Sequence, residues 1–528
     1  MALGEILQDE RTFIDQNGRM YRIKSPEPLS EPPKQLVIAR SSKPWGIYLR
    51  MLGTVIPAFF LMYVLLFLVM GVIMLEPSAV LISGICSAPL VFLILSLHKP
   101  RLVHVSLASP DEMGSQAHAL PNGTSLRTPM KTSFVRYLVK DDSILDVPPN
   151  RQLWVIFSSV ILIGVALSAM LYSDVESLQV VSVSIFILVG IPIWFIGFSL
   201  PVLAWWGTSN KLLGLPTRRR DAEAWLMAGM ASAFPAFIFN SLLAPEIANS
   251  ILDQDHWSYE FSLLAVGAPI CEEIFKAMAV AAFLPYINGP KKGFQVGFTV
   301  GLGFALIENF QYIGISLFGG PVGLSFTILV RGVGSIPGHA VWTAISGTAI
   351  GWLATDRKLK AKLSWKARSM AISAIDIAEG IGIDTDGDGD LSGFDGFRPS
   401  LEEAITQASK ENVDESNPWI ILGRDSDNDD SEKTLFGNND FILSYEKNET
   451  PNYLRGIHTP RGIYAALALS ISGHSFWNGS SFISFSAAKW LGMGEGEATL
   501  IMLSWIVLLI SSLLFVGRGV IRGINSLE

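Results

Sequence analysis

Long apolar runs separated by short polar loops dominate the chain. Each run approaches or exceeds the roughly 20 residues that a helix needs to cross the hydrocarbon core of a bilayer. The runs lie near residues 52–75, 78–97, 153–172, 180–205, 223–243, 260–284, 294–317, 323–354, 463–486 and 498–516. The pattern therefore predicts an all-α polytopic membrane protein with about ten transmembrane helices and a cytoplasmic insert between the eighth and ninth.

Composition agrees with this class of protein. Of the 528 residues, 50% are hydrophobic and only 16% are charged, below the roughly 25% of soluble domains. The formal net charge of −8 is concentrated in one polar insert and does not suggest nucleic-acid binding. Both cysteines lie in apolar runs, so neither a disulfide framework nor a zinc-thiolate site is indicated.

The loops between the runs predict the orientation. Lysine and arginine collect before the first run, in 98–151, in 207–220, at 291–292, in 357–368 and after the last run. The alternate loops are short and acidic or neutral. By the positive-inside rule, both termini of this multi-pass cell-membrane protein are cytoplasmic. Residues 1–46 are polar and mixed in charge, which predicts a soluble segment rather than a signal peptide.

The polar insert contains a loop of the calcium-binding type. Its carboxylates are Asp384, Asp386, Asp388, Asp390 and Asp395. They occupy positions 1, 3, 5, 7 and 12 of an EF-hand-like loop whose sixth residue is glycine. Position 12 departs from the pattern, because aspartate has a shorter arm than the usual glutamate. The two interpretations are a Ca²⁺ site that regulates the protein and a merely acidic turn.

The run 260–284 carries two adjacent carboxylates and a cation, Glu272, Glu273 and Lys276. Ionisable groups inside a bilayer cost about 2.5–3.5 kcal/mol each on insertion scales. On a helix, Lys276 shares a face with both glutamates, at spacings of four and three residues. One cation leaves one carboxylate partly uncompensated, and such a group is suited to work as a general base. The alternative is an internal ion pair that only fixes helix packing.

Three later runs carry further polar residues at helical spacing. These are Glu308 with Tyr312, Arg331 ahead of His339 and Trp342, and His474 with Asn478. Each set alone is compatible with structural hydrogen bonding. Together they imply one shared wet cavity, because separate burial of each group would be costly. The run 323–354 is interrupted by Pro337-Gly338, so we expect a broken helix that lines this cavity.

The residue types limit the reactions that this cavity could catalyse. No Gly-x-Ser-x-Gly elbow, zincin His-Glu-x-x-His motif or phosphate-binding glycine loop is present. In one scheme, Glu272 or Glu273 activates water as a general base. His339 and His474 are then its partners and Asn478 an oxyanion donor. In the other, Glu273, His339 and His474 hold Zn²⁺, which lowers the pKa of bound water to about 7. Both schemes give peptide hydrolysis.

At these residues the sequence resembles the PrsW family of intramembrane proteases, which lies near the CAAX prenyl proteases and bacteriocin-processing enzymes. The matching pieces are Glu272-Glu273-x-x-Lys276, Phe304-x-x-x-Glu308-Asn309-x-x-Tyr312, Arg331 ahead of Pro337-Gly338-His339-x-x-Trp342, and His474-x-x-x-Asn478. They cover about 260–354 and 460–486. The resemblance implies a multi-pass protease that cleaves a membrane-tethered protein with its two glutamates and its histidines. The family is often labelled metalloprotease, whereas related enzymes look like metal-free glutamate proteases.

We therefore predict an intramembrane endopeptidase that acts on membrane-anchored proteins within the lipid bilayer, in a role that suits regulated proteolysis. The residues expected to orient the site and tune its charge are Lys276, Glu308, Tyr312 and Arg331. A proton-coupled transporter or channel could use the same buried Glu/His/Lys cluster. The motifs have no repeat in 52–243, which argues against a transporter built from two matching halves. A binding scaffold with a degenerate site is a third interpretation.

Five segments are expected along the chain. They are a cytoplasmic N-terminal segment, 1–46; five N-terminal transmembrane helices, 47–245; the first part of the catalytic transmembrane core, 258–354; a soluble cytoplasmic insert, 355–460; and the second part of the core, 461–518. The insert is the only sizeable soluble piece that the pattern predicts.

Overall fold

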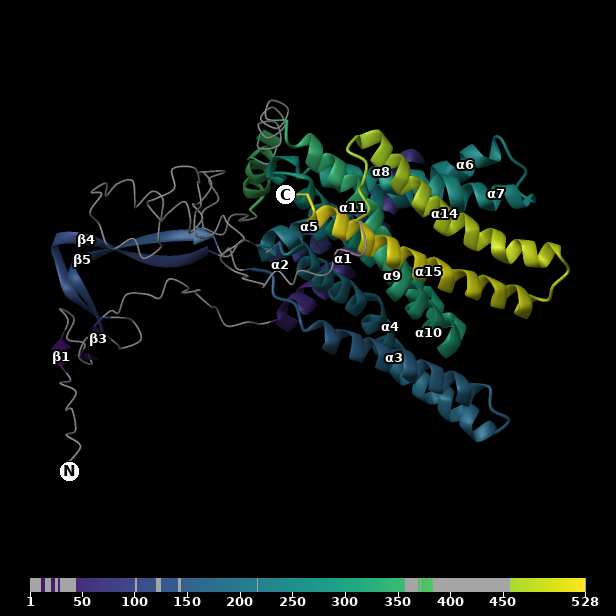
Figure 1. Cartoon of the computed structure of the whole chain (residues 1–528), viewed down its shortest axis with the longest axis horizontal. Helices are drawn as coiled ribbons and strands as arrows, with labels where there is room; N and C mark the ends of the chain where they lie inside the picture. The colour runs from purple at the N-terminus through teal and green to yellow at the C-terminus, as the bar shows by residue number, and fades with distance from the viewer. Residues whose placement is uncertain are drawn as a thin grey trace. The chain divides into compact units, whose positions relative to one another are not determined.

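The computed structural model divides into two compact units (Figure 1). The first comprises Met1–Arg40, Pro100–Asp142 and Glu379–Lys447, and the second Ser41–Lys99, Ser143–Ala378 and Asn448–Glu528. The structure describes residues 11–14, 20–23, 27–28, 44–99, 102–119, 125–140, 144–215, 217–356, 369–370, 372–382 and 456–527. The predicted calcium loop, 384–395, lies outside the described residues, as do most of 1–46 and most of the insert.

The first unit contains β-strands. β1 (Arg11–Ile14) pairs antiparallel with β2 (Met20–Ile23). β5 (Ser125–Lys140) is the central strand of a three-stranded sheet, antiparallel to β4 (Leu102–Ala119) and parallel to β3 (Glu27–Pro28). The register between β4 and β5 shifts near Pro110 and Ser115.

These strands correct the prediction in one respect. The all-α description holds for the apolar runs but not for 102–140, which we expected to be only a cationic loop. The insert is therefore not the only sizeable polar segment of the chain. A signal for the strands is present in the sequence, because runs rich in Val, Leu, Phe and Tyr lie on both sides of Asn122-Gly123. Asn-Gly between such runs is typical of a hairpin.

The second unit is a bundle of helices. In chain order they are α1 (Pro44–Ile73), α2 (Pro77–His98), α3 (Asn150–Leu171), α4 (Glu176–Leu213), α5 (Arg219–Ile238), α6 (Ala244–Asn249), α7 (Trp257–Ser262), α8 (Ala268–Ala281), α9 (Pro290–Ser316), α10 (Gly320–Val330), α11 (Ile336–Leu353), α14 (Ile463–Trp490) and α15 (Glu495–Asn525). Wider π-helical turns join three pairs of them: η1 (Phe239–Leu243) lies between α5 and α6, η2 (Leu263–Gly267) between α7 and α8, and η5 (Arg331–Ser335) between α10 and α11. Two short 3₁₀ turns, η3 (Leu284–Tyr286) and η4 (Leu317–Gly319), precede α9 and α10.

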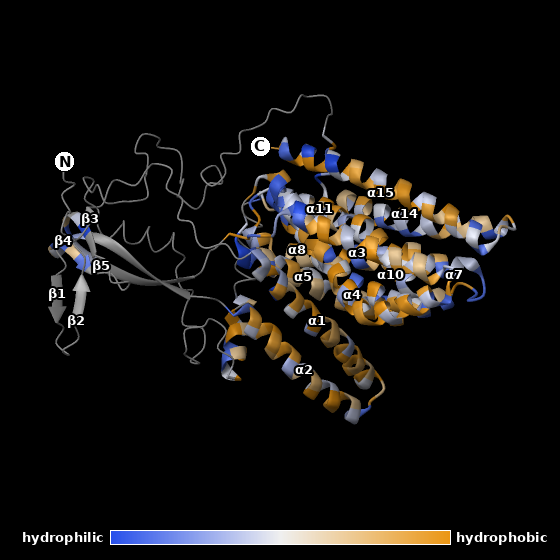
Figure 2. Cartoon of the chain, turned by 90° about the horizontal axis from the view of Figure 1, so that it is seen from below, coloured by the Kyte–Doolittle hydropathy of each residue, from blue (hydrophilic) through white to orange (hydrophobic). Residues whose placement is uncertain are grey.

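All ten apolar runs of the sequence are helical. Among the described residues, seven helical stretches are long and apolar enough to cross a membrane, with α9 through α11 counted as one stretch of 64 residues. The stretch from α7 to α8 and helix α14 are not among the seven; they carry buried ionisable residues, Glu272, Glu273 and Lys276 on α8 and His474 on α14. Figure 2 shows hydrophobic residues along the length of the outer helices, as expected for surfaces that face lipid.

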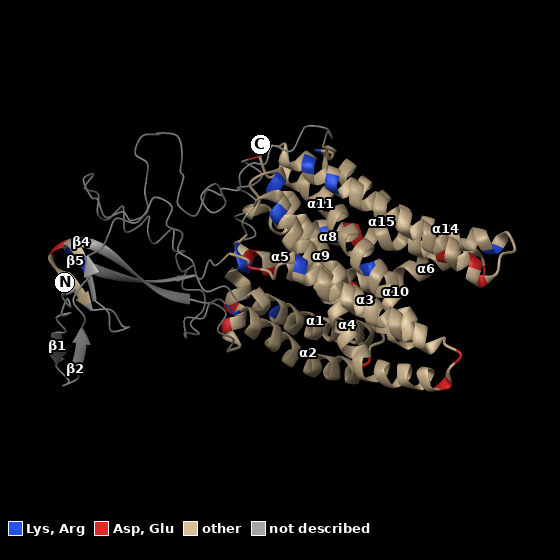
Figure 3. Ribbon diagram, turned by 60° about the horizontal axis from the view of Figure 1, so that its bottom comes forward, with Lys and Arg blue, Asp and Glu red and all other residues tan. Residues whose placement is uncertain are grey.

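The charges of the second unit are distributed unevenly (Figure 3). Lys and Arg lie mainly at one end of the helical bundle, and acidic residues mark the turns at the other end. This separation is compatible with the positive-inside rule, with the cationic end on the cytoplasmic side. The cytoplasmic location of both termini stays a prediction.

Helices α9 and α11 are in direct backbone contact. A Cβ atom at Gly297 would lie 2.6 Å from the carbonyl oxygen of Thr343, and one at Gly301 would overlap the carbonyl oxygen of His339. Glycines at this four-residue spacing let membrane helices approach closely. As a result, the backbone of His339 is fixed against α9, the helix that also carries Glu308.

Helices α4 and α5, from the N-terminal spans, pack against α9 and η5. A Cβ atom at Gly229 of α5 would overlap the backbone of Val300 on α9, which fixes α5 against α9. From α4, the indole of Trp194 donates to the carbonyl of Phe310 across 3.1 Å. The indole of Trp205, also on α4, donates to the carbonyl of Gly332 in η5 across 2.9 Å. The first spans therefore support the helices and turns from which the polar side chains project.

Candidate active site

Three helices bring five predicted site residues together inside the bundle. Glu272, Glu273 and Lys276 come from α8, His339 from α11 and His474 from α14. The most exposed of the five, Glu272, has only 7% of its surface accessible, and Lys276 has none. Burial of this many ionisable groups is tolerable only because they contact one another.

Glu273 is at the centre of a buried ion pair. Lys276 Nζ donates to Glu273 Oε1 across 2.5 Å and lies 3.1 Å from Nδ1 of His339. The same carboxylate oxygen lies 3.0 Å from Nδ1 of His474. A carboxylate in this position favours the tautomer of His474 with its proton on Nδ1. The Nε2 lone pair of His474 is then left for another partner.

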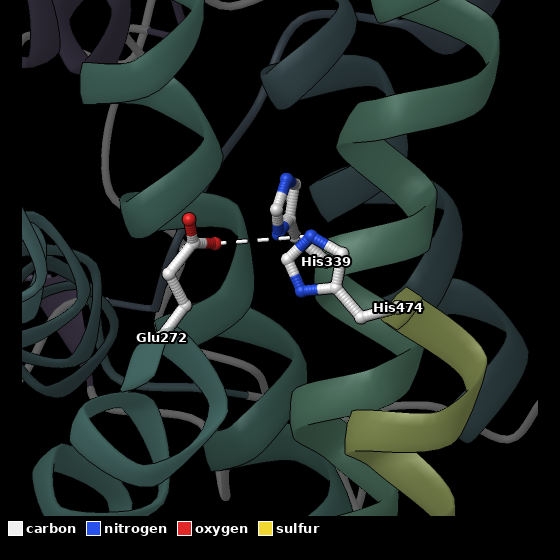
Figure 4. Close-up of side chains that lie close together, drawn as sticks. All are labelled: Glu272, His339 and His474. Carbon is white, nitrogen blue, oxygen red and sulfur yellow. Dashed lines mark ion pairs between the residues drawn. The ribbon is translucent and has the colours of Figure 1, made fainter. Parts of the chain in front are cut away.

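Glu272 is the carboxylate without a close cation. Its Oε2 atom lies 4.0 Å from Lys276 Nζ and 3.8 Å from Nε2 of His474, and it accepts no hydrogen bond. Its Oε1 atom accepts a hydrogen bond of 3.3 Å from Nδ2 of Asn240. Figure 4 shows the side chains of Glu272, His339 and His474 converging. An unpaired buried carboxylate oxygen is costly, so Oε2 is suited to receive a reacting group.

Glu308 and Arg331 form a second ionic cluster beside His339. Glu308 Oε2 lies 2.8 Å from Nε2 of His339 and 3.1 Å from an Arg331 nitrogen. Arg331 also donates to Asn309 across 2.6 Å, and its guanidinium lies 3.9 Å from the ring centroid of Tyr312. Arg331 thus neutralises Glu308, and Glu308 orients His339. Tyr312 contributes its ring face to this cluster.

A small cavity opens beside these groups. It has a volume of about 110 Å³ and is lined by Glu308, Val330, Arg331, Ser335, His339, Trp342, His474, Trp477 and Asn478. Trp342 stacks on the imidazole of His474. Asn478, the predicted oxyanion donor, lines the cavity and donates from Nδ2 to the carbonyl oxygen of Leu264 across 3.0 Å.

A possible metal site includes Glu272 rather than Glu273. Among the described residues, Glu272, His339 and His474 each offer one ligand atom, and these atoms lie within 4.8 Å of one another. One Glu with two His is a donor set that zinc accepts in hydrolases, and the unpaired Oε2 of Glu272 fits a ligand. Nδ1 of His339, however, is contacted by Lys276, so coordination through that atom requires this contact to open.

Asn240 is a site residue that the sequence analysis missed. It lies in η1, at the end of an apolar run in which the sequence predicted no site residue, and its partner Glu272 is 32 positions away. Trp477 and Ser335 also line the cavity. The sequence analysis did not identify them, because neither belongs to a charged pair. A lone asparagine inside an apolar run is the only signal that could have pointed to Asn240.

The fold and the site together define a multi-pass membrane protein with a buried carboxylate–imidazole centre. Residues 222–375 match the family model described as PrsW family intramembrane metalloprotease. This match confirms the resemblance to that family over the segment that holds α8, α9, α10 and α11; α14, with His474, lies beyond it. No curated protein and no solved structure matches the chain.

Proposed function

We propose that this protein is an intramembrane endopeptidase that hydrolyses peptide bonds of membrane-tethered proteins. The observation that carries the proposal is the unpaired Oε2 atom of Glu272, which faces Nε2 of His474 at 3.8 Å. This pair lies inside the bundle, in a chain that matches an intramembrane protease family. A proton-coupled transporter is not favoured, because the family match is to proteases.

Glu272 is the proposed general base. Its Oε2 atom takes a proton from the attacking water, while the water oxygen forms a bond to the carbonyl carbon of the substrate. The same proton then passes to the amide nitrogen as the C–N bond breaks, which yields a free acid and a free amine. Asn478 and Arg331 line the adjacent cavity and carry N–H groups that can stabilise the oxyanion.

Glu273 and Glu308 are the proposed positioning residues. Each contacts one imidazole, Glu273 that of His474 and Glu308 that of His339. Such carboxylate–imidazole contacts orient histidines in both metal-bound and metal-free hydrolytic sites. A zinc ion held by Glu272, His339 and His474 would supply a bound water with a pKa near 7.

The same proposal includes the orientation and the regulation of the enzyme. Both termini would be cytoplasmic, and the substrate would reach the site from within the bilayer. The acidic loop between Asp384 and Asp395 would bind Ca²⁺ and couple the insert to activity. Calcium titration of the full-length protein, monitored by calorimetry, tests this role; an absence of binding heat would remove it.

The test of the enzyme assignment is proteolysis in detergent against a panel of single-span reporter proteins. We expect cleavage by the wild type and none by Glu272→Gln. The matched control is Glu223→Gln, since Glu223 is also a buried ion-paired carboxylate, bound bidentately by Arg50 at 2.9 and 2.8 Å. It should retain cleavage if it still folds, as judged by its elution and thermal transition.

A zinc chelator distinguishes the metal-free mechanism from the zinc-dependent mechanism. Cleavage that survives chelation assigns a metal-free glutamate protease, whereas loss that zinc restores assigns a metalloprotease. Cleavage by Glu272→Gln at the wild-type rate would contradict the role of Glu272 in either version.

A further inference from the structure

Three π-helical turns occur where helices contribute to the site. η1 contains Asn240, η2 contains Leu264, whose carbonyl accepts from Asn478, and η5 begins at Arg331. A π turn inserts one residue into a helix and disturbs its hydrogen-bond ladder, and such turns are frequent at functional sites. The turn at η1 gives the span 219–249 a contact with the site, although the sequence predicted no site residue in that span.

Among the described residues, Asn240 donates the only hydrogen bond that Glu272 accepts. Its Nδ2 atom donates to Oε1 across 3.3 Å, while Oε2 accepts none. The Oδ1 atom of Asn240 has no hydrogen-bond partner either, so no other donor competes for the orientation of its amide. Because a carboxylate is planar, fixing one oxygen restricts where the other can point.

We propose that Asn240 is a positioning residue that holds Oε1 of Glu272, so that Oε2 faces Nε2 of His474. Asn240 can do this because α5 is fixed against α9 through the close contact at Gly229. Its amide reaches the site through the hydrogen bond to Glu272, so its role is exerted through that carboxylate. This inference rests on the proposed function, because it assigns to Asn240 the orientation of the proposed general base.

The kinetic test compares three substitutions of Asn240 in the full-length protein with a reporter that the wild type cleaves. Asn240→Leu keeps the shape of the side chain and removes the donor; we expect kcat to fall roughly tenfold or more, as for a lost hydrogen bond to a charged group. KM should stay within about twofold of the wild type. Asn240→His retains an N–H donor near the same branch point and should recover much of the loss, whereas Asn240→Ala should not.

The matched control is Asn525→Leu. Asn525 also donates from its amide to a partner in the bundle, the carbonyl of Leu212 at 2.6 Å, but far along the chain from the site helices. We expect its kcat to equal that of the wild type. Unchanged kcat in Asn240→Leu, or equal losses in Asn240→Leu and Asn240→His, would overturn the inference.

A second measurement does not depend on activity. Infrared difference spectra identify the carboxyl band of Glu272 as the one lost in Glu272→Gln. We expect this band to shift in Asn240→Leu and to stay in place in Asn525→Leu; an unshifted band in Asn240→Leu contradicts the contact. If the wild type cleaves no reporter, the proposed function fails, and the infrared result still decides whether Asn240 holds Glu272.

Discussion

Trp342 lies flat against His474, with ring centroids 4.7 Å apart and ring planes 14° apart. The helices that carry these two residues are also joined by Ser470, whose hydroxyl donates to the carbonyl oxygen of Trp342 across 2.7 Å. The imidazole is therefore fixed from two directions, by the indole against its face and by Glu273 at Nδ1. Its Nε2 atom points toward Glu272 as a result.

The first prediction follows from this stack. Aromatic pairs are worth about 0.5–1.5 kcal/mol beyond the area they bury. Trp342→Ala should lower kcat for reporter cleavage by about tenfold, because His474 gains rotational freedom. Trp342→Phe keeps an aromatic face and should lose less. Steady-state cleavage by both variants measures the difference; equal rates for Trp342→Ala and the wild type would show that the stack has no role in catalysis.

The second prediction concerns Lys276. Removing one partner of a buried ion pair costs about 3–5 kcal/mol, because the other charge stays buried and unpaired. Lys276→Met should therefore lower the thermal transition of the purified protein and abolish cleavage. The double variant Lys276→Met with Glu273→Gln should recover part of the stability but not the activity. Calorimetry in detergent tests this, and a double variant no more stable than Lys276→Met would contradict the ion-pair argument.

The third prediction concerns the contact between α9 and α11. A methyl group at Gly301 would overlap the backbone of His339, so Gly301→Ala must separate the two helices. We expect a loss of about 1–3 kcal/mol, as for overpacked cores, and reduced cleavage, since Glu308 and His339 would move apart. Gly84→Ala is the control, because no atom beyond its own stretch of helix lies within 4 Å of a Cβ at that position. Its thermal transition should match the wild type.

The fourth prediction concerns orientation. Single cysteines at Asp174, in the turn between α3 and α4, and at Lys211, near the end of α4, lie at opposite ends of one helix and are exposed. In a background without Cys86 and Cys271, an impermeant maleimide should label Asp174→Cys in intact cells. Lys211→Cys should react only after permeabilisation. The reverse pattern would place the cationic end outside.

The sequence predicted which residues come together in the site, but it did not predict which of them contact one another. Helical spacing places Glu272, Glu273 and Lys276 on α8, and the cost of burying charges predicts that His339 and His474 join them. The sequence cannot tell which glutamate pairs with Lys276, because spacings of three and four residues are equivalent on an isolated helix. The difference arises from His474, which arrives from α14 and contacts Glu273 at 3.0 Å and Glu272 only at 3.8 Å.

Other features depend on contacts that no local pattern encodes. The π turn at η1 and the contact of Asn240 arise from packing between spans, so periodicity in the run 223–243 could not show them. The strands at 102–140 are a different case. Their alternating residues and their Asn-Gly pair were available in the sequence, but the positive charge of the segment led to its interpretation as a loop.

The site is assembled from helices on both sides of a long polar segment. α8, α9 and α11 precede residue 355, whereas α14, with His474, begins only at Ile463. At synthesis rates of about 5–20 residues per second, His474 follows His339 by several seconds or more. During that interval Glu272 and Glu273 lack their imidazole partner from α14. The order of the chain therefore delays completion of the proposed hydrolytic centre until the last spans are made.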